Sequence, residues 1–401
     1  MSLKQYFQRH SRLLDLRAAT GRYLINAIGF VEVLVLPLLL APANYAEIER
    51  HKQLVAFSPV VLLGAGLGYL KLHFKEESDF NSGSYTLGAL ISCFAVSAIL
   101  ASFGANPFLV LSVFLYIFTS AIEKQLLGCN RLLIAYSYKA FISVALIVGT
   151  LIFTCYAPEE LDAGLLYSIA IIVALSVWIS FSVKSASFPC ITNIEVLWRC
   201  VCKYAEMIKS GFILNLLTFA IILHFIFERK VVADYFPEQL PSYSLAYAFS
   251  QIGIVLINAI AYAFQHKFGL TSNQLQPKEY RAYRNAMIFL YVLLLIGSIP
   301  LVYVYQIYYD GYDGLLEIYL SFYLFSGLYF ALTSTSVVAL YLGLSKAALA
   351  SFLVFLFFNV LFSPFVGFGY SSIFLYLVKS GLLIVGAGAY LDYRIIKQLG
   401  S

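Results

Sequence analysis

The sequence has few charged residues. Asp, Glu, Lys and Arg make up 12% of its 401 residues, against about a quarter in ordinary soluble domains. It also lacks any long polar stretch in which a soluble domain could be placed. Hydrophobic residues make up 61% of the chain, compared with roughly 45 to 50% in soluble proteins. This balance excludes an ordinary soluble protein and predicts an integral membrane protein.

Several catalytic and nucleotide-binding motifs are missing as well. The sequence contains no GxxxxGK[ST] loop, no HExxH pair and no GxSxG elbow, and its five histidines are scattered. Three of the six cysteines, Cys190, Cys200 and Cys202, lie close together, but a lone Cys-x-Cys is a weak metal signal. We therefore expect no ATP-driven transport by this chain, no cofactor, no metal and no enzymatic site of the soluble type.

Long apolar runs occupy most of the chain. A helix that crosses the bilayer core needs about 20 apolar residues, and we identify twelve candidate spans. Backbone groups in lipid must be satisfied within helices, and the runs are too long for barrel strands. The predicted fold is thus all-α, with twelve transmembrane helices. The spans are 22–41, 54–74, 84–104, 107–126, 132–156, 164–184, 209–228, 243–265, 285–307, 315–341, 346–366 and 371–391.

Basic residues are distributed unevenly between the connections. Of the 26 Lys and Arg residues, 21 fall on alternate connections, 4 on the other connections and one, Lys379, inside a span. Connections rich in Lys and Arg stay in the cytoplasm, so both termini are expected to be cytoplasmic. The basic start runs directly into a full-length apolar helix, so no cleavable signal peptide is expected. Net charge of +5 reflects this bias, and we expect no nucleic-acid partner.

The longest connection divides the chain into two halves of six spans. We expect an amphipathic helix in this connection, lying in the inner headgroup layer near Trp198. The predicted organisation is a basic cytoplasmic amino-terminal segment (1–20), a first six-helix lobe (21–184), a cytoplasmic linker (185–208), a second six-helix lobe (209–391) and a cytoplasmic tail (392–401).

The two halves begin with similar residues. At an offset of 190 residues, Gly21 matches Gly211 and Leu24 matches Leu214, while 43–45 (ANY) falls against 233–235 (ADY). Leu, Ala and Gly recur by chance in apolar sequence, so these matches alone do not establish a duplication. A duplicated six-helix unit is nevertheless a common way to build an alternating-access transporter.

Short patterns around the first two spans of each half resemble a known family. The first half contains 21–26 (GRYLIN), 40–45 (LAPANY) and a Gly-rich stretch, 62–68 (LLGAGLG). The second half contains Glu228-Arg229 where the family has an Asp-Arg-like pair, followed by 243–246 (YSLA). These patterns resemble the O-antigen and capsule-type polysaccharide flippases of the multidrug/oligosaccharidyl-lipid/polysaccharide (MOP) exporter superfamily.

The resemblance implies two six-helix lobes around a central cavity in a bacterial inner membrane. It implies translocation, by alternating access, of an undecaprenyl-pyrophosphate-linked oligosaccharide for O-antigen or other surface polysaccharide synthesis. The implied partners are that lipid-linked oligosaccharide, membrane lipids, a coupling proton or Na⁺, and a polymerase of the same pathway. Two alternatives stay open: a polysaccharide polymerase of that pathway, which the short outer connections disfavour, and a cation-coupled drug exporter of the same superfamily.

Charged residues deep in the predicted spans are candidates for the transport cavity. Glu32 lies ten residues, or about 15 Å, beyond Arg22, and Lys379 lies eight residues into the last span. Uncompensated charge at such depth is costly, so each is expected to face a polar interior, where they either pair or act separately. Asn26 is a further candidate, and Arg22 and Lys71 lie nearer the cytoplasmic edge, where snorkelling is the alternative.

A second group of candidates lies at the predicted inner ends of the fourth and fifth spans. These residues are expected to form an inner gate, with ordinary interface anchoring as the alternative. They are Glu123, Lys124, Arg131 and Lys139.

Overall fold

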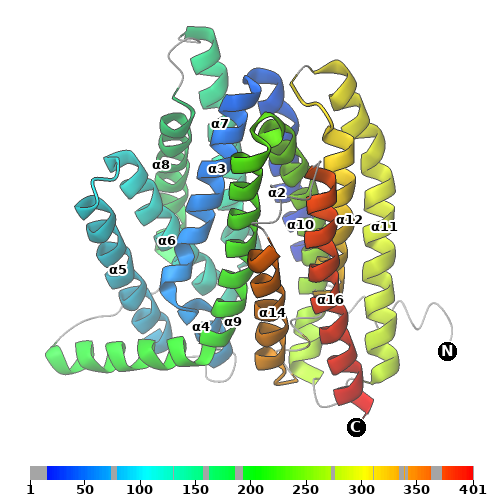
Figure 1. Cartoon of the computed structure of the whole chain (residues 1–401). Helices are drawn as coiled ribbons and strands as arrows, with labels where there is room; N and C mark the ends of the chain where they lie inside the picture. Colours follow the sequence, from blue (N-terminus) through cyan, green and yellow to red (C-terminus); the bar gives the residue numbers. More distant parts are fainter. Residues whose placement is uncertain are drawn as a thin grey trace. The chain divides into compact units, whose positions relative to one another are not determined.

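The computed structural model describes most of the chain and consists of helices joined by short connections (Figure 1). Among the described residues no β-strand occurs, which agrees with the predicted all-α fold. The described residues are 16–73, 79–129, 131–156, 162–185, 193–271, 276–309, 311–333, 338, 342–362 and 373–400.

The chain forms two compact units. One, here called unit A, comprises residues 27–222, and the other, unit B, comprises 1–26 together with 223–401. Two helices run from one unit into the other: α2 (Leu16–Leu39) and α9 (Ile194–Tyr235). The covalent links between the units are therefore helical rather than loose loops.

Unit A is built from the second part of α2, the first part of α9 and the helices between them. Helix α8 packs against both α6 and α7, and α5 packs against α6. Besides α2 and α9, its helices are α3 (Pro42–Phe57), the 3-10 helix η1 (Ser58–Leu62), α4 (Ala65–His73), α5 (Asp79–Ser102), α6 (Pro107–Gly128), α7 (Leu132–Tyr156), α8 (Ala163–Ser182) and η3 (Val183–Ser185).

Unit B is centred on α12, which packs against α10, α11 and α16. Its buried interior is rich in aromatic rings, such as the stacked pair Tyr319 and Tyr323, whose centroids are 5.3 Å apart. Besides the end of α9, its helices are η4 (Pro237–Gln239), α10 (Leu240–Thr271), α11 (Pro277–Tyr308), α12 (Leu315–Thr333), α14 (Ser345–Phe362) and α16 (Ile373–Gly400).

Each predicted span coincides with helical structure in the described residues. Six helices are long and apolar enough to cross a membrane, and a seventh span is obtained if the two bent parts of α9 are counted as one. Parts of α2, α12 and α14 are apolar but shorter. The protein is thus a multi-pass membrane protein, and its helices occupy the positions of the twelve spans expected from hydropathy.

The second predicted span, 54–74, is the one that differs most from the structure. The helix begins at Pro42, well before residue 54, and it is broken by η1 before it continues as α4. Pro42 occupies the first turn of the helix, where its missing N–H costs nothing. Hydropathy did not detect this part of the helix because residues 47–52 (EIERHK) are mostly polar. At the break, Leu63 and Gly64 have positive φ values of 50° and 84°.

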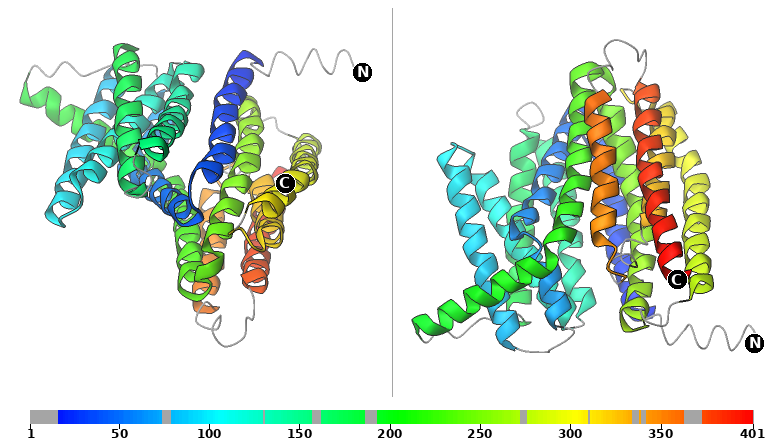
Figure 2. Two further views of the ribbon diagram at one scale, coloured as in Figure 1. Left: turned by 90° about the horizontal axis from the view of Figure 1, so that it is seen from above. Right: turned by 60° about the horizontal axis from the view of Figure 1, so that its bottom comes forward.

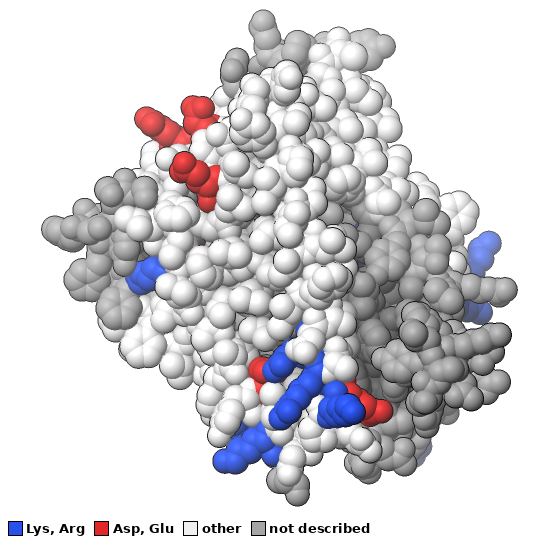
Figure 3. Space-filling view, turned by 90° about the vertical axis from the view of Figure 1, so that its right-hand side faces the viewer, with Lys and Arg blue, Asp and Glu red and all other residues white. Residues whose placement is uncertain are grey.

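Basic residues gather at one end of unit B. Lys278, Arg281 and Arg284 lie in the first turns of α11, and Arg394 and Lys397 lie in the last turns of α16. In the face shown in Figure 3, Lys and Arg side chains gather near the bottom, where α11 begins and α16 ends in Figure 1; a few acidic side chains lie among them, and others lie near the top. At the basic end Arg284 is paired with Asp392 at 2.8 Å, and the cytoplasmic location of this end stays a prediction.

Candidate functional site

A buried ionic cluster in unit A contains one of the predicted cavity residues. We call Glu32, Glu49, Lys52 and Ser143 the Glu32 cluster. The Lys52 ammonium donates to Glu32 Oε1 and to Glu49 Oε1, each at 2.7 Å, and the Ser143 hydroxyl donates to Glu32 Oε2. Three helices contribute: α2 supplies Glu32, α3 supplies Glu49 and Lys52, and α7 supplies Ser143.

The local sequence explains why these groups meet. Glu49 and Lys52 are three residues apart on α3, so they share one helix face. Glu32 is only 4% exposed and Glu49 is equally buried, while the Lys52 side chain keeps 26% of its surface. Two carboxylates and one ammonium carry a formal charge of −1. An uncompensated charge in such surroundings is costly, so the cluster is suited to take up one positive charge.

The predicted inner-gate residues lie elsewhere in unit A. Glu123 is buried at the end of α6; it accepts a hydrogen bond from the Tyr138 hydroxyl at 3.1 Å and pairs with the Lys124 ammonium at 3.4 Å. Lys139 is exposed, and its ammonium lies 5.9 Å from the centre of the Tyr138 ring. Arg131 is exposed just before α7. The structure thus gathers three of the four around Tyr138, and their role in a gate stays a prediction.

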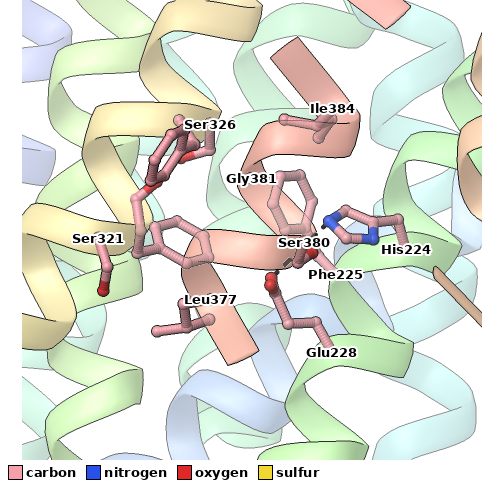
Figure 4. Close-up of a pocket in the computed structure, with 11 residues that line it drawn as sticks. His224, Phe225, Glu228, Ser321, Ser326, Leu377, Ser380, Gly381 and Ile384 are labelled. Atoms are coloured by element: carbon pink, nitrogen blue, oxygen red, sulfur yellow. Dashed lines mark hydrogen bonds and ion pairs between the residues drawn. The ribbon is translucent and has the colours of Figure 1, made fainter. Parts of the chain in front are cut away.

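Unit B contains a second buried polar cluster, the Glu228 cluster: His224, Glu228, Tyr243, Asn359 and Ser380. Figure 4 shows three of its members, His224, Glu228 and Ser380. The Tyr243 hydroxyl donates to Glu228 Oε2 at 3.2 Å, and His224 Nε2 lies 3.8 Å from the same oxygen. The Asn359 side-chain nitrogen lies 3.3 Å from both His224 Nδ1 and Ser380 Oγ. The helices α9, α10, α14 and α16 are thus joined by one polar network.

A small cavity lies beside this network. In Figure 4, His224 and Glu228 extend from α9 towards Ser380 on α16, while Ser321 and Ser326 lie on α12 across from them. The cavity has room for about one water molecule. Glu228 is 3% exposed. Arg229, the next residue, donates to Ser244 on α10 at 2.6 Å.

The other predicted cavity residues lie on three helices, and only some of their side chains are described. Lys379 lies on α16, immediately before Ser380, and is half-buried. Arg22 and Asn26 belong to α2 and Lys71 to α4, but their side chains lie outside the described residues. Glu32 pairs with Lys52, a base that the sequence had placed on an outer connection. Whether these residues line a transport cavity stays a prediction.

Three charged residues were missed by the sequence reasoning: the buried acids Glu49 and Glu228, and the half-buried Lys52. A spacing signal existed for each. Glu49 and Lys52 are three residues apart, and His224 and Glu228 are four residues apart in an otherwise apolar run. Such pairs face the same side of a helix. Glu49 and Lys52 were overlooked because hydropathy assigned the polar start of α3 to a loop.

Comparisons with known proteins agree on the fold. No protein-family model and no curated protein sequence matches this chain. Among solved structures, an inward-facing multidrug resistance MATE family transporter of the MOP superfamily aligns with a TM-score of 0.62 and 16% identity, covering 96% of each chain. A variant of the Vibrio cholerae MATE transporter VcmN aligns with a TM-score of 0.65 and 13% identity, covering 98% of this chain and 97% of that one.

A third similar structure is a MOP superfamily transporter from Pyrococcus furiosus, described as having a binding pocket of reversed polarity. It aligns with a TM-score of 0.59 and 12% identity over 96% of each chain. The expectation of a MOP-type fold is confirmed, whereas these neighbours do not single out the polysaccharide flippases. The chain therefore has the two-lobed, all-helical fold of the MATE transporters.

Proposed function

We propose that this protein is an alternating-access transporter in which the Glu32 cluster binds the coupling proton. The proposal rests on the observation that the buried carboxylates of Glu32 and Glu49 share the Lys52 ammonium, each at 2.7 Å. The formal charge of −1 is removed when one carboxylate binds a proton. The Lys52 ammonium already occupies the position between both acids that a metal cation would need, whereas a proton bonds to a single carboxylate oxygen. A proton is thus the better coupling ion than Na⁺.

Protonation acts on the packing of α2. A neutral Glu32 loses its ionic attraction to Lys52 on α3 and holds Ser143 on α7 less strongly. A ligand shifts a conformational equilibrium only by its difference in affinity for the two states. Because α2 continues from unit A into unit B, a change in its packing is passed along the helix to the other unit.

For the substrate, we propose an undecaprenyl-pyrophosphate-linked oligosaccharide in a bacterial inner membrane, with both termini cytoplasmic. A pyrophosphate cannot cross about 30 Å of hydrocarbon without cationic, polar surroundings. Lys379 supports this proposal because it is a half-buried base about 9 Å from the start of the last helix. The transporter fold gives the polymerase alternative no support.

A drug exporter is the second candidate, favoured by the buried acids Glu32, Glu49 and Glu228, which suit a cationic cargo. Two of the similar structures are MATE transporters, one of them a multidrug resistance transporter. The two candidates differ in the charge of the cargo, so one assay with two cargoes separates them.

The test uses the purified full chain in proteoliposomes with an imposed proton gradient. One arm contains an undecaprenyl-pyrophosphate-linked oligosaccharide with a fluorescent sugar, whose leaflet is read with an impermeant quencher; the other contains a quaternary ammonium dye. We expect lipid flipping, reduced about tenfold by Lys379→Ala, equivalent to about 1.4 kcal/mol. The matched control Lys397→Ala removes an exposed base near the end of the same helix.

Dye uptake without lipid flipping would support the drug exporter and overturn the substrate proposal. Lipid flipping that is unchanged in Lys379→Ala would refute the role of that lysine but leave the substrate standing.

A further inference from the structure

The first part of α9 has three distinct faces. We call residues 194–213 the lateral segment; in Figures 1 and 2 it runs crosswise to the helices of unit A. The lateral segment meets the remainder of α9, 215–235, at a bend of 51°. It belongs entirely to unit A.

One face is packed against the protein. Cys200, Tyr204, Met207 and Gly211 recur at helical spacing and are buried. The Tyr204 hydroxyl lies 3.3 Å from Ser92 Oγ on α5.

Glycines just before α4, on α4 and on α5 allow this close approach. A Cβ atom on Gly68 would overlap the backbone of Met207, one on Gly64 would overlap Gly211, and one on Gly88 would overlap the Tyr204 ring. The lateral segment is therefore seated firmly on α4 and α5, and its orientation is fixed within unit A.

A second face is apolar and exposed. Ile194, Trp198, Val201, Ala205 and Phe212 follow one another at intervals of three, four or seven residues, so they form one stripe at 3.6 residues per turn. Trp198 is 67% exposed and Ile194 is 84% exposed. Isolated apolar side chains on a surface are ordinary, but a continuous apolar stripe indicates a contact surface.

The third face is charged. Glu195 pairs with Arg199, and Lys203 pairs with Glu206 at 2.8 Å. Lys209 is exposed at the border between this face and the apolar stripe, because it lies four residues after Ala205 and three before Phe212. An apolar stripe with a tryptophan, flanked by a face carrying Lys and Arg, is the pattern of a helix that lies in the interface plane of a bilayer.

We propose that the lateral segment is a membrane-surface anchor whose apolar stripe is embedded among phospholipids of the inner leaflet. The occupant is lipid because the segment continues directly into residues 215–235, and the two parts together are long and apolar enough for one bent membrane span, which holds the stripe at the edge of the bilayer. Arg199 and Lys203 then face the phosphate layer and water, and Lys209, at the edge of the stripe, lies where its ammonium can reach the phosphates. This proposal does not depend on the transported substrate or on the coupling proton.

The chain offers a convenient probe, because it contains only two tryptophans. Trp178 is 1% exposed, and its indole N–H donates to Ser137 Oγ at 2.9 Å and to the Ile134 carbonyl at 3.1 Å. The variant Trp178→Phe leaves Trp198 as the only tryptophan, and Trp198→Phe is the matched control that leaves Trp178. If Trp178→Phe fails to fold, the difference in emission between the wild type and Trp198→Phe reports on Trp198.

The experiment reconstitutes the full chain into phosphatidylethanolamine–phosphatidylglycerol vesicles that contain brominated phospholipids. Helices of this kind lie about 5 to 10 Å into the headgroup–acyl boundary. We therefore expect bromine near the headgroup end of the acyl chain to quench Trp198 about twofold more than bromine near the chain end, and we expect aqueous iodide to quench it little. Efficient iodide quenching without bromolipid quenching would overturn the proposal, as would protection from both quenchers, which would indicate a covering protein.

Discussion

Glu32 in unit A and Glu228 in unit B are buried glutamates at matching places in their helices, but their surroundings differ. Each lies seven residues before the last residue of its helix, α2 or α9, and each bonds to a group on the next long helix. Glu32 is held by the Lys52 ammonium. Glu228 is held by the Tyr243 hydroxyl and faces His224. The same position thus carries an ion pair in one unit and a hydrogen-bonded acid in the other.

This difference separates two uses of a buried acid. In the Glu32 cluster a permanent cation is shared by two acids, which leaves one negative charge for a proton to remove. In the Glu228 cluster the carboxylate belongs to a network that ties four helices together through hydroxyl, imidazole and amide groups. We therefore propose that proton coupling belongs to the cluster of unit A and helix packing to the corresponding position of unit B.

The largest expected effect comes from removing the cation of the Glu32 cluster. Lys52→Met leaves two buried carboxylates without their shared ammonium, and breaking a buried ion pair typically costs about 3 to 5 kcal/mol. We expect a loss of about 3 kcal/mol in the free energy of unfolding in detergent, since Lys52 keeps some solvent contact. The measurement is denaturant unfolding followed by circular dichroism.

Arg50→Met is the matched control for Lys52→Met. Arg50 lies on the same helix and pairs with Glu47 at 3.5 Å in an exposed position, so its loss is expected to change stability by less than about 1 kcal/mol. Equal effects of the two substitutions would mean that Lys52 is not the compensating charge of a buried cluster.

A smaller effect is expected from removing a single hydrogen bond to each of the two acids. These substitutions test the comparison between the two clusters directly. Ser143→Ala removes one donor to Glu32, which keeps Lys52, whereas Tyr243→Phe removes the hydroxyl donor to Glu228. Leaving a buried group unsatisfied costs about 1 to 3 kcal/mol. We expect Tyr243→Phe to fall in the upper part of this range and Ser143→Ala in the lower part, by the same unfolding measurement. The reverse order would remove the distinction between the two clusters.

Much of the fold could be predicted from the sequence, because hydropathy reports on length and composition. Twelve apolar segments correspond to helical structure. The break in the second span was not predicted, because it arises from the left-handed backbone at Leu63 and Gly64, which hydropathy does not record. The polar beginning of α3 was missed for a related reason: its charges are compensated by tertiary contacts with α2.

The internal repeat stays a prediction, but the structure allows two registers between the halves to be compared. An offset of 190 residues matches 43–45, at the start of α3, with 233–235, at the end of α9. Matching the helix ends instead, α2 at Leu39 and α9 at Tyr235, aligns Glu32 with Glu228. Small apolar residues recur too often to fix a register, whereas buried charges and helix ends do so.

The candidate site was predicted in part. Glu32 was found because a lone acid in an apolar span is costly and therefore informative. Its partner was not found, because Lys52 lies 20 residues away on another helix, and only tertiary structure brings the two together. Glu228 was noted only as part of the Glu228-Arg229 pair and not as a site residue.

The most direct test of proton coupling is transport in proteoliposomes under an imposed pH gradient, with Glu32→Gln and Glu49→Gln compared with the wild type. Each substitution removes one carboxylate from the Glu32 cluster. The remaining carboxylate and the Lys52 ammonium form a neutral ion pair, so the cluster needs no proton in either variant. We predict that both variants fold but lose the acceleration of transport by the pH gradient. Retention of full pH-driven transport by both variants would contradict the assignment of proton coupling to the Glu32 cluster.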